Sequence, residues 1–296
     1  MQGYLFALSA GILWGLVGFF SKTLNHYTTA ATTIACYRLF IAFFGFFIIY
    51  SIKDRKILFL KKAEWIPSLI LGFFCQTIVN GALFKSIALT GSITGLILLC
   101  TGPIFTAAFS YIFFKEKLSL YTILSVMLTF FGVFLILTDG AMSFLNKSIM
   151  GIAYGFASGI FFGLFPVLMR IFMLKGLNPI ALLAYSLFFG GIFLFPYVGL
   201  HDASIIFTNY HILLYLLLIG FVSTTIADYL FISSLNYLSA TKVSLLTLIE
   251  IPFIAIVGIF LLKEKLFFYQ LLGMLLFLIG VVFNKFTVAE QKGEKS

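Results

Sequence analysis

The sequence predicts an all-α, polytopic membrane protein with ten transmembrane helices as two inverted five-helix repeats. Three observations lead to this prediction: an extreme apolar composition, a series of long apolar runs, and landmarks that recur at half the chain length. Of the 296 residues, 62% are hydrophobic and 10% are charged, and the mean hydropathy is +1.14. Soluble domains carry about 25% charged residues, so the solvent of this chain is a lipid bilayer.

The apolar runs follow one another along the chain with short polar connections. A run of about 20 apolar residues is long enough to cross the hydrocarbon core as a helix. The runs do not alternate in polarity, which favours helices over the strands of a membrane barrel, and helices satisfy their own backbone groups in lipid. The predicted spans are residues 3–21, 30–50, 66–84, 93–114, 120–138, 150–169, 178–199, 211–233, 241–262 and 268–286.

The second half of the chain repeats the first. The tetrapeptide KEKL at 115–118 returns 148 residues later, at 263–266. The same offset superimposes further landmarks: Gly11 on Gly159, Tyr37 on Tyr185, Gly72 on Gly220 and Asn80 on Asp228. Since each copy contains an odd number of spans, the second copy enters the membrane upside down relative to the first. We therefore predict one repeat over 1–148 and another over 149–296, joined in one integral membrane unit.

The distribution of basic residues predicts the orientation. With the amino terminus inside, thirteen Lys and Arg residues near span ends fall on the inner side and five on the outer side. Cytoplasmic loops carry such an excess, so both termini are expected to face the cytoplasm from the cell inner membrane. Topology and contact with anionic lipid account for the net charge of +9, and no nucleic-acid partner is expected.

No motif for catalysis or metal binding stands out. The sequence contains no HExxH, no GxSxG and no Gly-rich phosphate loop. Its cysteines, Cys36, Cys75 and Cys100, fall inside predicted spans and are expected to be small buried apolar residues. The prediction is a protein that is not an enzyme and needs no cofactor or metal.

Three ionisable residues lie far from span ends and carry the strongest functional signal. Arg38 falls in the second span, Asp228 near the centre of the eighth and Glu250 near the middle of the ninth. Each costs about 2.5–3.5 kcal/mol at membrane depth unless it is paired or hydrated, so each should face the bundle interior. Arg38 either neutralises one acid or contacts substrate. One arginine cannot compensate two carboxylates, so at least one is expected to be protonated or hydrated, as proton coupling requires.

Polar and aromatic residues near these three positions are candidates for the lining of one hydrated cavity. Gln76 and Asn80 lie four apart on span three, and threonines precede both acids at helical spacing. An indole or hydroxyl at membrane depth needs a polar partner, which adds Trp14 and the matched tyrosines. The predicted substrate-binding residues are Trp14, Tyr37, Arg38, Gln76, Asn80, Tyr185, Thr224 and Thr247. The predicted proton-coupling residues are Asp228, favoured because its counterpart Asn80 cannot titrate, and Glu250.

Small residues recur every four positions in the first and sixth spans. They allow close approach of helices in lipid, so we expect these two helices to pack tightly. Their matching places also make them candidate pivots for a rocking motion of the halves. The residues are Ala7, Gly11 and Gly15 in span one and Gly155, Gly159 and Gly163 in span six.

Several motifs together resemble the drug/metabolite transporter superfamily, EamA type, over nearly the full chain. They are YRLFIAF at 37–43, CTGPIFTAAFSYIFFKEKL at 100–118 and IEIPFIAIVGIFLLKEKL at 249–266. In each half a mid-span proline precedes an acidic and basic turn: Pro103 lies 13 residues before Glu116, and Pro252 lies 12 before Glu264. The resemblance implies a central cavity between inverted halves, alternating access and, for direction, export.

These observations predict a permease that moves a small organic metabolite. One cation and two acids near Trp and Tyr suit an amino acid or similar zwitterion, exported in exchange for protons. One alternative is uptake or facilitated diffusion of a cationic or nucleoside-like solute, held by carboxylates or an aromatic cage. Another is a non-transporting membrane scaffold or sensor. The expected partners are a small-molecule substrate, protons and membrane lipid, and the protein is expected to be a monomer or homodimer.

Overall fold

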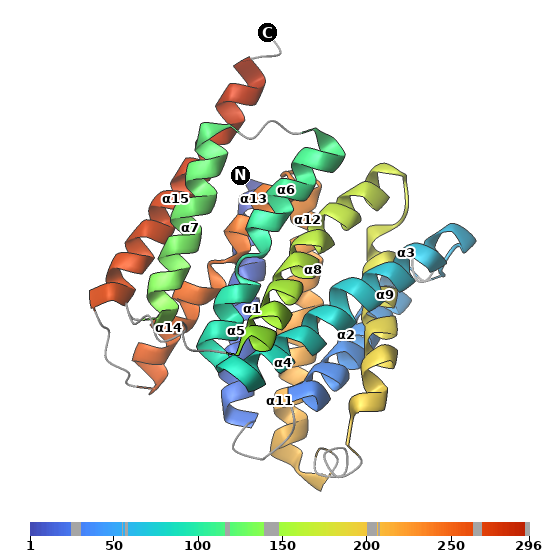
Figure 1. Ribbon diagram of the computed structural model, residues 1–296. Coiled ribbons are helices and arrows are strands. Elements are labelled where there is room, and N and C mark those ends of the chain that lie inside the picture. Colours follow the sequence, from blue (N-terminus) through green and yellow to red (C-terminus); the bar gives the residue numbers. More distant parts are fainter. Residues whose placement is uncertain are drawn as a thin grey trace.

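The computed structural model describes residues 1–24, 31–54, 56, 59–115, 119–138, 148–199, 206, 208–262 and 268–293, and this part of the chain is helical throughout its regular elements (Figure 1). The first half contains α1 (Gln2–Leu24), α2 (Ala31–Lys53), η3 (Lys62–Glu64), α3 (Trp65–Ile70), η4 (Leu71–Ile78), α4 (Val79–Thr90), α5 (Ser92–Leu99), α6 (Gly102–Phe114) and α7 (Leu120–Thr138). The second half contains α8 (Ile149–Leu174), α9 (Pro179–Leu194), η6 (Phe195–Tyr197), α11 (Tyr210–Gly220), η7 (Phe221–Ile226), α12 (Ala227–Leu235), α13 (Ala240–Thr247), α14 (Glu250–Leu262) and α15 (Phe268–Gly293).

These elements correspond to the predicted spans. Within the described residues, 8 helical stretches are long and apolar enough to cross a membrane, and shorter apolar helices occupy Gln2–Val17 and Phe268–Phe283 at the two ends of the chain. The third span is longer than predicted. It runs to Thr90 and stops at Gly91, whose φ of 90° is left-handed and suits glycine.

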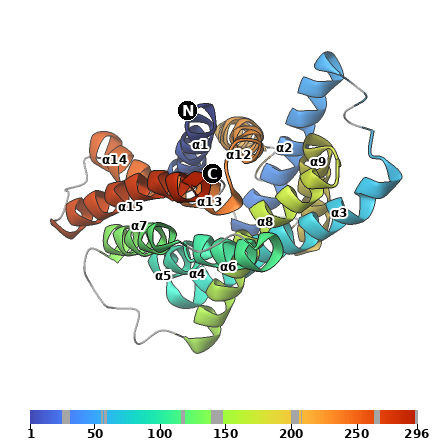
Figure 2. The ribbon, with the colours of Figure 1, turned by 90° about the horizontal axis from the view of Figure 1, so that it is seen from above.

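The two halves are inverted relative to each other, as predicted. The matching helices α2 and α9 pack side by side and run antiparallel: Cys36 near the start of α2 lies 3.4 Å from the Gly191 carbonyl, whereas Phe43 further along lies 5.7 Å from the earlier Tyr185 ring. The matching pair α7 and α15 is also antiparallel and lies at one edge of the bundle (Figure 2). Two equivalent helices that run in opposite directions require repeats of opposite orientation.

Spans four and nine are each broken in mid-membrane, which the apolar runs did not reveal. The first break separates α5 from α6 at Cys100 and Thr101, and the second separates α13 from α14 at Leu248 and Ile249. A proline stands in the first turn after each break, at 103 and 252. Proline lacks an N–H, which the first turn of a helix does not need but which a helix interior loses as a hydrogen bond, so these residues favour a fresh helix start.

The small-residue stripes pack tightly, but against the opposite half rather than mainly against each other. In α1, a Cβ on Gly11 would meet the Thr247 carbonyl oxygen of α13 at 2.5 Å. In α8, a Cβ on Gly163 would meet the Gly102 carbonyl oxygen of α6 at 2.3 Å. The first helix of each half therefore inserts into the other half. The reason is that glycine lets it approach the backbone of a broken helix.

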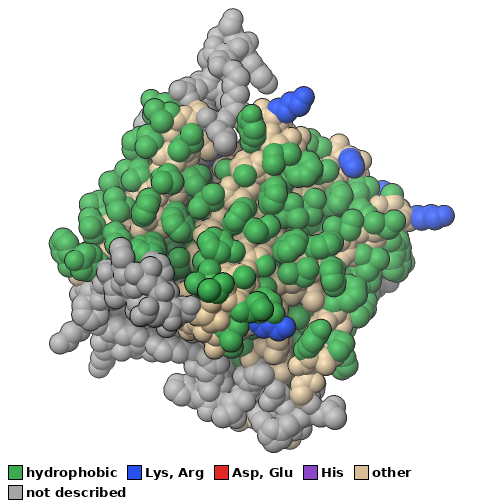
Figure 3. All heavy atoms as spheres, in the orientation of Figure 1, with side chains coloured by type: hydrophobic (Ala, Val, Ile, Leu, Met, Phe, Trp, Pro, Cys, Tyr) green, Lys and Arg blue, Asp and Glu red, His purple; other side chains and the backbone are tan. Residues whose placement is uncertain are grey.

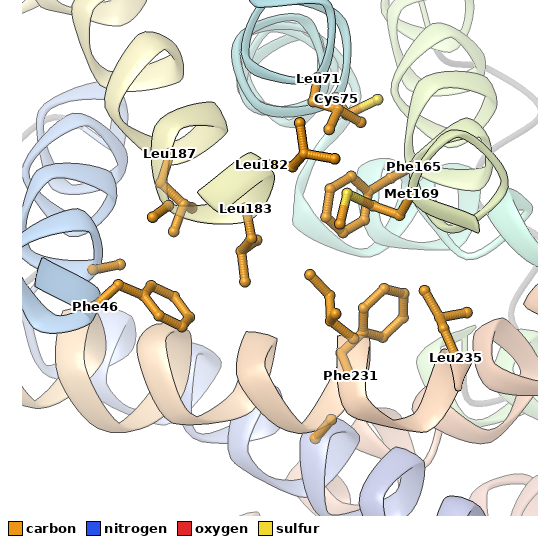
Figure 4. Close-up of a cluster of buried hydrophobic side chains, with 14 of the residues drawn as sticks. Phe46, Leu71, Cys75, Phe165, Met169, Leu182, Leu183, Leu187, Phe231 and Leu235 are labelled. Carbon is orange, nitrogen blue, oxygen red and sulfur yellow. The ribbon is translucent and has the colours of Figure 1, made fainter. Parts of the chain in front are cut away.

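The largest apolar core joins both repeats (Figure 4). It draws on residues along most of α2, from Ala35 to Tyr50, and along α9, from Leu182 to Leu194, together with residues of α1, α8, α12 and α13. Phe46, Leu71, Leu182 and Phe231 are at most 2% exposed. Cys36 and Cys75 belong to this core, and they and Cys100 are buried and free, as predicted.

Large apolar side chains cover the outer surface (Figure 3). Many of them are more than half exposed to the surroundings, including Phe44, Ile112 and Leu275. Contiguous exposed apolar area of this kind indicates lipid as the surrounding solvent, so the chain is a multi-pass membrane protein.

We predict that Gly132→Ala destabilises the protein, because a Cβ at 132 would meet the Gly273 carbonyl oxygen and the Phe277 amide nitrogen at 2.6 Å across the α7–α15 contact. Overpacking of this kind costs about 1–3 kcal/mol. The matched control is Gly81→Ala, where a Cβ meets nothing within 4 Å. Thermal unfolding in detergent should show a lower midpoint for the variant at 132 alone. Equal midpoints would contradict the tight α7–α15 contact.

Candidate functional site

Asn80 and Asp228 occupy equivalent places, each just after a stretch of π-helix. The η4 segment leads into α4, which contains Asn80, and η7 leads into α12, which contains Asp228. Single π turns inside α-helices occur often at functional sites. Because a π turn holds one more residue than an α turn, it changes the face on which the following residues lie.

Asp228 receives a hydrogen bond from the indole of Trp14. The Trp14 Nε1 donates to Asp228 Oδ1 at 2.8 Å, and the Asp228 side chain is 6% exposed. The Trp14 ring lies 5.0 Å from the Phe231 ring and 6.3 Å from the Phe162 ring. The carboxylate thus has one polar donor in a setting of aromatic rings contributed by α1, α8 and α12.

Arg38 lies close to this pair and is incompletely bonded. Its Nη2 donates to Asn80 Oδ1 at 3.2 Å, and the Asn80 amide nitrogen donates to the Gln76 carbonyl at 2.7 Å. The charge of Arg38 interacts electrostatically with Asp228. Its Nε is buried and has no hydrogen-bond partner. A buried donor without an acceptor is costly, so this guanidinium is suited to receive an anionic group.

Glu250 begins α14 at the break in span nine. Its side chain is half-buried, and no described side chain or backbone group forms a hydrogen bond or ion pair with its carboxylate. The matching break of span four lies at Cys100 and Thr101. A helix N-terminus stabilises negative charge. The Glu250 backbone abuts α1 at Gly15, next to Trp14, so α1 lies between the helices that carry the two acids.

Of the other predicted binding residues, Thr224 and Thr247 lie outside this network, and Gln76 joins it only through its backbone carbonyl. The hydroxyl of Thr224 donates to the Ile219 carbonyl and that of Thr247 to the Ser244 carbonyl, so both stabilise their own helices. Gln76 offers its backbone carbonyl to Asn80, and its side chain packs on Gly190. These contacts favour structural roles.

The two matched tyrosines lie in different surroundings. Tyr37 packs in an apolar cluster with Ile34 and Leu216 on the side of α11. The Tyr185 ring contacts Phe43 at 5.7 Å and Phe189 at 6.5 Å. The structure therefore brings together Trp14, Arg38, Asn80 and Asp228, but not the tyrosines.

Sequence reasoning missed two residues, Thr77 and Thr225, whose hydroxyls bond within the π-helical segments. Thr77 Oγ1 donates to the Gly72 carbonyl and Thr225 Oγ1 to the Gly220 carbonyl, both at 3.0 Å. The repeat could have revealed them, because the offset that matches the two glycines also matches the two threonines.

The fold and site define a polytopic membrane transporter built from inverted repeats, with broken helices and ionisable groups between its halves. The chain belongs to the EamA-like transporter family, whose model matches residues 1–138 and again residues 149–286. This membership agrees with the resemblance to the drug/metabolite transporter superfamily seen in the sequence motifs.

Similar proteins carry transporter names. The chain is 25% identical to the uncharacterized transporter YoaV of Bacillus subtilis over 96% of this chain and 97% of that protein. It is 33% identical to an uncharacterized transporter of Methanothermobacter thermautotrophicus over 42% of this chain and 39% of that protein. A solved crystal structure shares the fold with a TM-score of 0.79 at 12% identity, over 95% of both chains. These findings set aside the scaffold or sensor alternative.

We predict that the fluorescence of Trp14 reports the ionisation of Asp228. The chain contains two tryptophans, so Trp65→Phe leaves Trp14 as the single indole. Protonation removes the carboxylate that accepts its N–H bond, and the emission should therefore change with pH. The additional substitution Asp228→Asn should abolish this transition. A transition that persists in the double variant would show that another group titrates beside Trp14.

Proposed function

We propose that this transporter exports a small zwitterionic metabolite, with amino acids as the first candidate class, in exchange for protons. The observation that supports this proposal is the Arg38 guanidinium, whose buried Nε–H has no acceptor and whose charge interacts with the carboxylate that Trp14 bonds. An amino acid carries the complementary pair of charges on neighbouring atoms.

Each side chain of the site would bind a different part of such a ligand. Arg38 would hold the carboxylate of the substrate through charge-assisted hydrogen bonds, which are stronger than neutral ones. Asp228 would bind its ammonium group. The Trp14 and Phe231 rings, 5.0 Å apart, would contact its apolar part. Asn80 would keep Arg38 oriented, since it already accepts from the guanidinium.

The two acids supply a route for proton coupling. A proton and a substrate ammonium group compete for the Asp228 carboxylate, so proton entry would release substrate. Glu250, at the start of a half-helix, is the second candidate proton acceptor. Transport by this scheme is an antiport. The export direction rests on the resemblance to the family.

We further propose that the protein lies in the cytoplasmic membrane with both termini inside, as the basic residues predict. The start of α1 and the end of α15 lie at the same end of the bundle (Figure 1).

Asp228→Asn tests the proton coupling in proteoliposomes. The amide keeps the shape but cannot titrate, so the substituted protein should lose both the pH dependence of its transport rate and uphill transport driven by a proton gradient. Asn80→Asp, at the matching position, is a control for the introduction of charge. Unchanged rates and unchanged pH dependence in Asp228→Asn would sink the coupling scheme.

Arg38→Gln tests the substrate class in a thermal-shift screen of amino acids, amines and nucleosides. A ligand that binds the native state raises its apparent stability, by about 2.7 kcal/mol at a concentration 100 times Kd. Stabilisation by an amino acid should occur in the parent protein and disappear in Arg38→Gln. Stabilisation by amines or nucleosides that survives in Arg38→Gln would instead support the alternative of a cationic or nucleoside-like solute, for which the Trp14 and Asp228 pair is suited.

A further inference from the structure

The two π-helical segments of the described chain form a symmetric pair with an unusual hydrogen bond. In the described α-helices, threonine hydroxyls donate to a carbonyl three or four residues earlier, as Thr247 does to Ser244 and Thr90 to Ser86. Thr77 and Thr225, and Thr224 beside Thr225, instead reach back five residues. This longer reach fits the wider π turn.

Each of these hydroxyls also contacts a helix of the opposite half. Thr77 Oγ1 lies 3.3 Å from the Gly190 carbonyl oxygen of α9, and Thr225 Oγ1 lies 3.3 Å from the Ala42 carbonyl oxygen of α2. A hydroxyl has one proton, so it is shared between two carbonyls in each case. The same two distances, 3.0 and 3.3 Å, occur in both repeats, which indicates that the geometry belongs to the repeated fold and is not an accident at one position.

The site depends on the register that these turns set. Successive residues of an α-helix are about 100° apart around the axis. If η7 relaxed to an α turn, Asp228 would rotate by about this angle and leave the Trp14 indole. The same change in η4 would move Asn80 away from Arg38.

We propose that Thr77 and Thr225 are matched positioning residues, which hold the two π turns against the opposite half and thereby orient Asn80 and Asp228 toward Arg38 and Trp14. This inference rests on the proposed function, in which Asp228 exchanges a proton. The Asp228 carboxylate accepts from Trp14 of α1 and interacts electrostatically with the charge of Arg38 of α2, so a change in the facing of Asp228 alters both interactions together.

The test uses Trp65→Phe protein in detergent, with Trp14 as the single fluorophore. Asp228→Ala defines the emission of an indole that has lost its partner. Thr225→Val, which keeps the shape of the side chain without its hydroxyl, should shift the emission maximum in the same direction and lose the pH-dependent transition. Thr225→Ser, which restores a hydroxyl, should recover both signals.

Thr129→Val is the matched control, because its hydroxyl bonds only within α7 at the distant α7–α15 pair. It should leave Trp14 emission unchanged. Thr77→Val should also spare this emission, because its turn orients Asn80, but it should weaken the amino-acid stabilisation that depends on Arg38. Circular dichroism and size-exclusion chromatography establish that each variant is folded.

The outcomes separate the inference from the proposed function. If Thr225→Val keeps the parent emission maximum, or if Thr129→Val shifts it equally, Thr225 does not orient Asp228 and the inference is wrong. If Thr225→Val shifts the maximum as expected but Asp228→Asn retains the pH transition and pH-dependent transport, the orientation by Thr225 is supported while the proton role of Asp228 fails.

Discussion

The structure depends on one constraint: a charged side chain in the middle of a bilayer must find its partners inside the bundle. Asp228 meets this requirement through Trp14, which comes from the other repeat. That bond is possible only because α1 inserts against α12 and α13 of the second half, which its small residues allow. The packing of the glycine stripe and the chemistry of the acid are therefore two consequences of the same helix contact.

The two repeats share their architecture, and the candidate site lies where their side chains differ in charge. Both halves contain a π-helical turn, a threonine that bridges two carbonyls, and a broken fourth helix. The three ionisable residues of the site, however, have no ionisable counterpart in the other half. Asn80 stands at the position equivalent to Asp228, Gly102 at that of Glu250 and Ser186 at that of Arg38. The acids lie in the second half and the arginine in the first. Two halves of matching fold thus place negative side chains on one side of their interface and a positive side chain on the other.

Much of the fold could be predicted from the sequence because its signals are long-range and redundant. The apolar runs gave the spans, and the odd number of spans per repeat gave the inversion. The breaks at Cys100 and at Leu248 were missed because a half-helix is as apolar as a whole one. The π turns were missed because the contacts that we propose hold them, from Thr77 to the Gly190 carbonyl and from Thr225 to the Ala42 carbonyl, form only in the folded chain.

The candidate site was predicted in part. Ionisable and indole groups in a membrane helix must be turned inward, whatever the details of packing. This requirement explains why the structure brings together Trp14, Arg38, Asn80 and Asp228. Periodicity also placed Thr224 and Thr247 on the inner faces, but a threonine in a helix can satisfy its hydroxyl on its own backbone, and both do so. Equivalence in the repeat did not give Tyr37 and Tyr185 equivalent surroundings, because their neighbours differ.

In the proposed scheme, substrate and proton compete for the Asp228 carboxylate between the two halves. The pH change when a stabilising ligand is added to purified protein in unbuffered solution measures this competition. Competition requires proton release by the wild-type protein and none by Asp228→Asn that still binds the ligand. Binding without proton release by the wild-type protein over the pH range of the Trp14 transition, or equal release by both proteins, would contradict it.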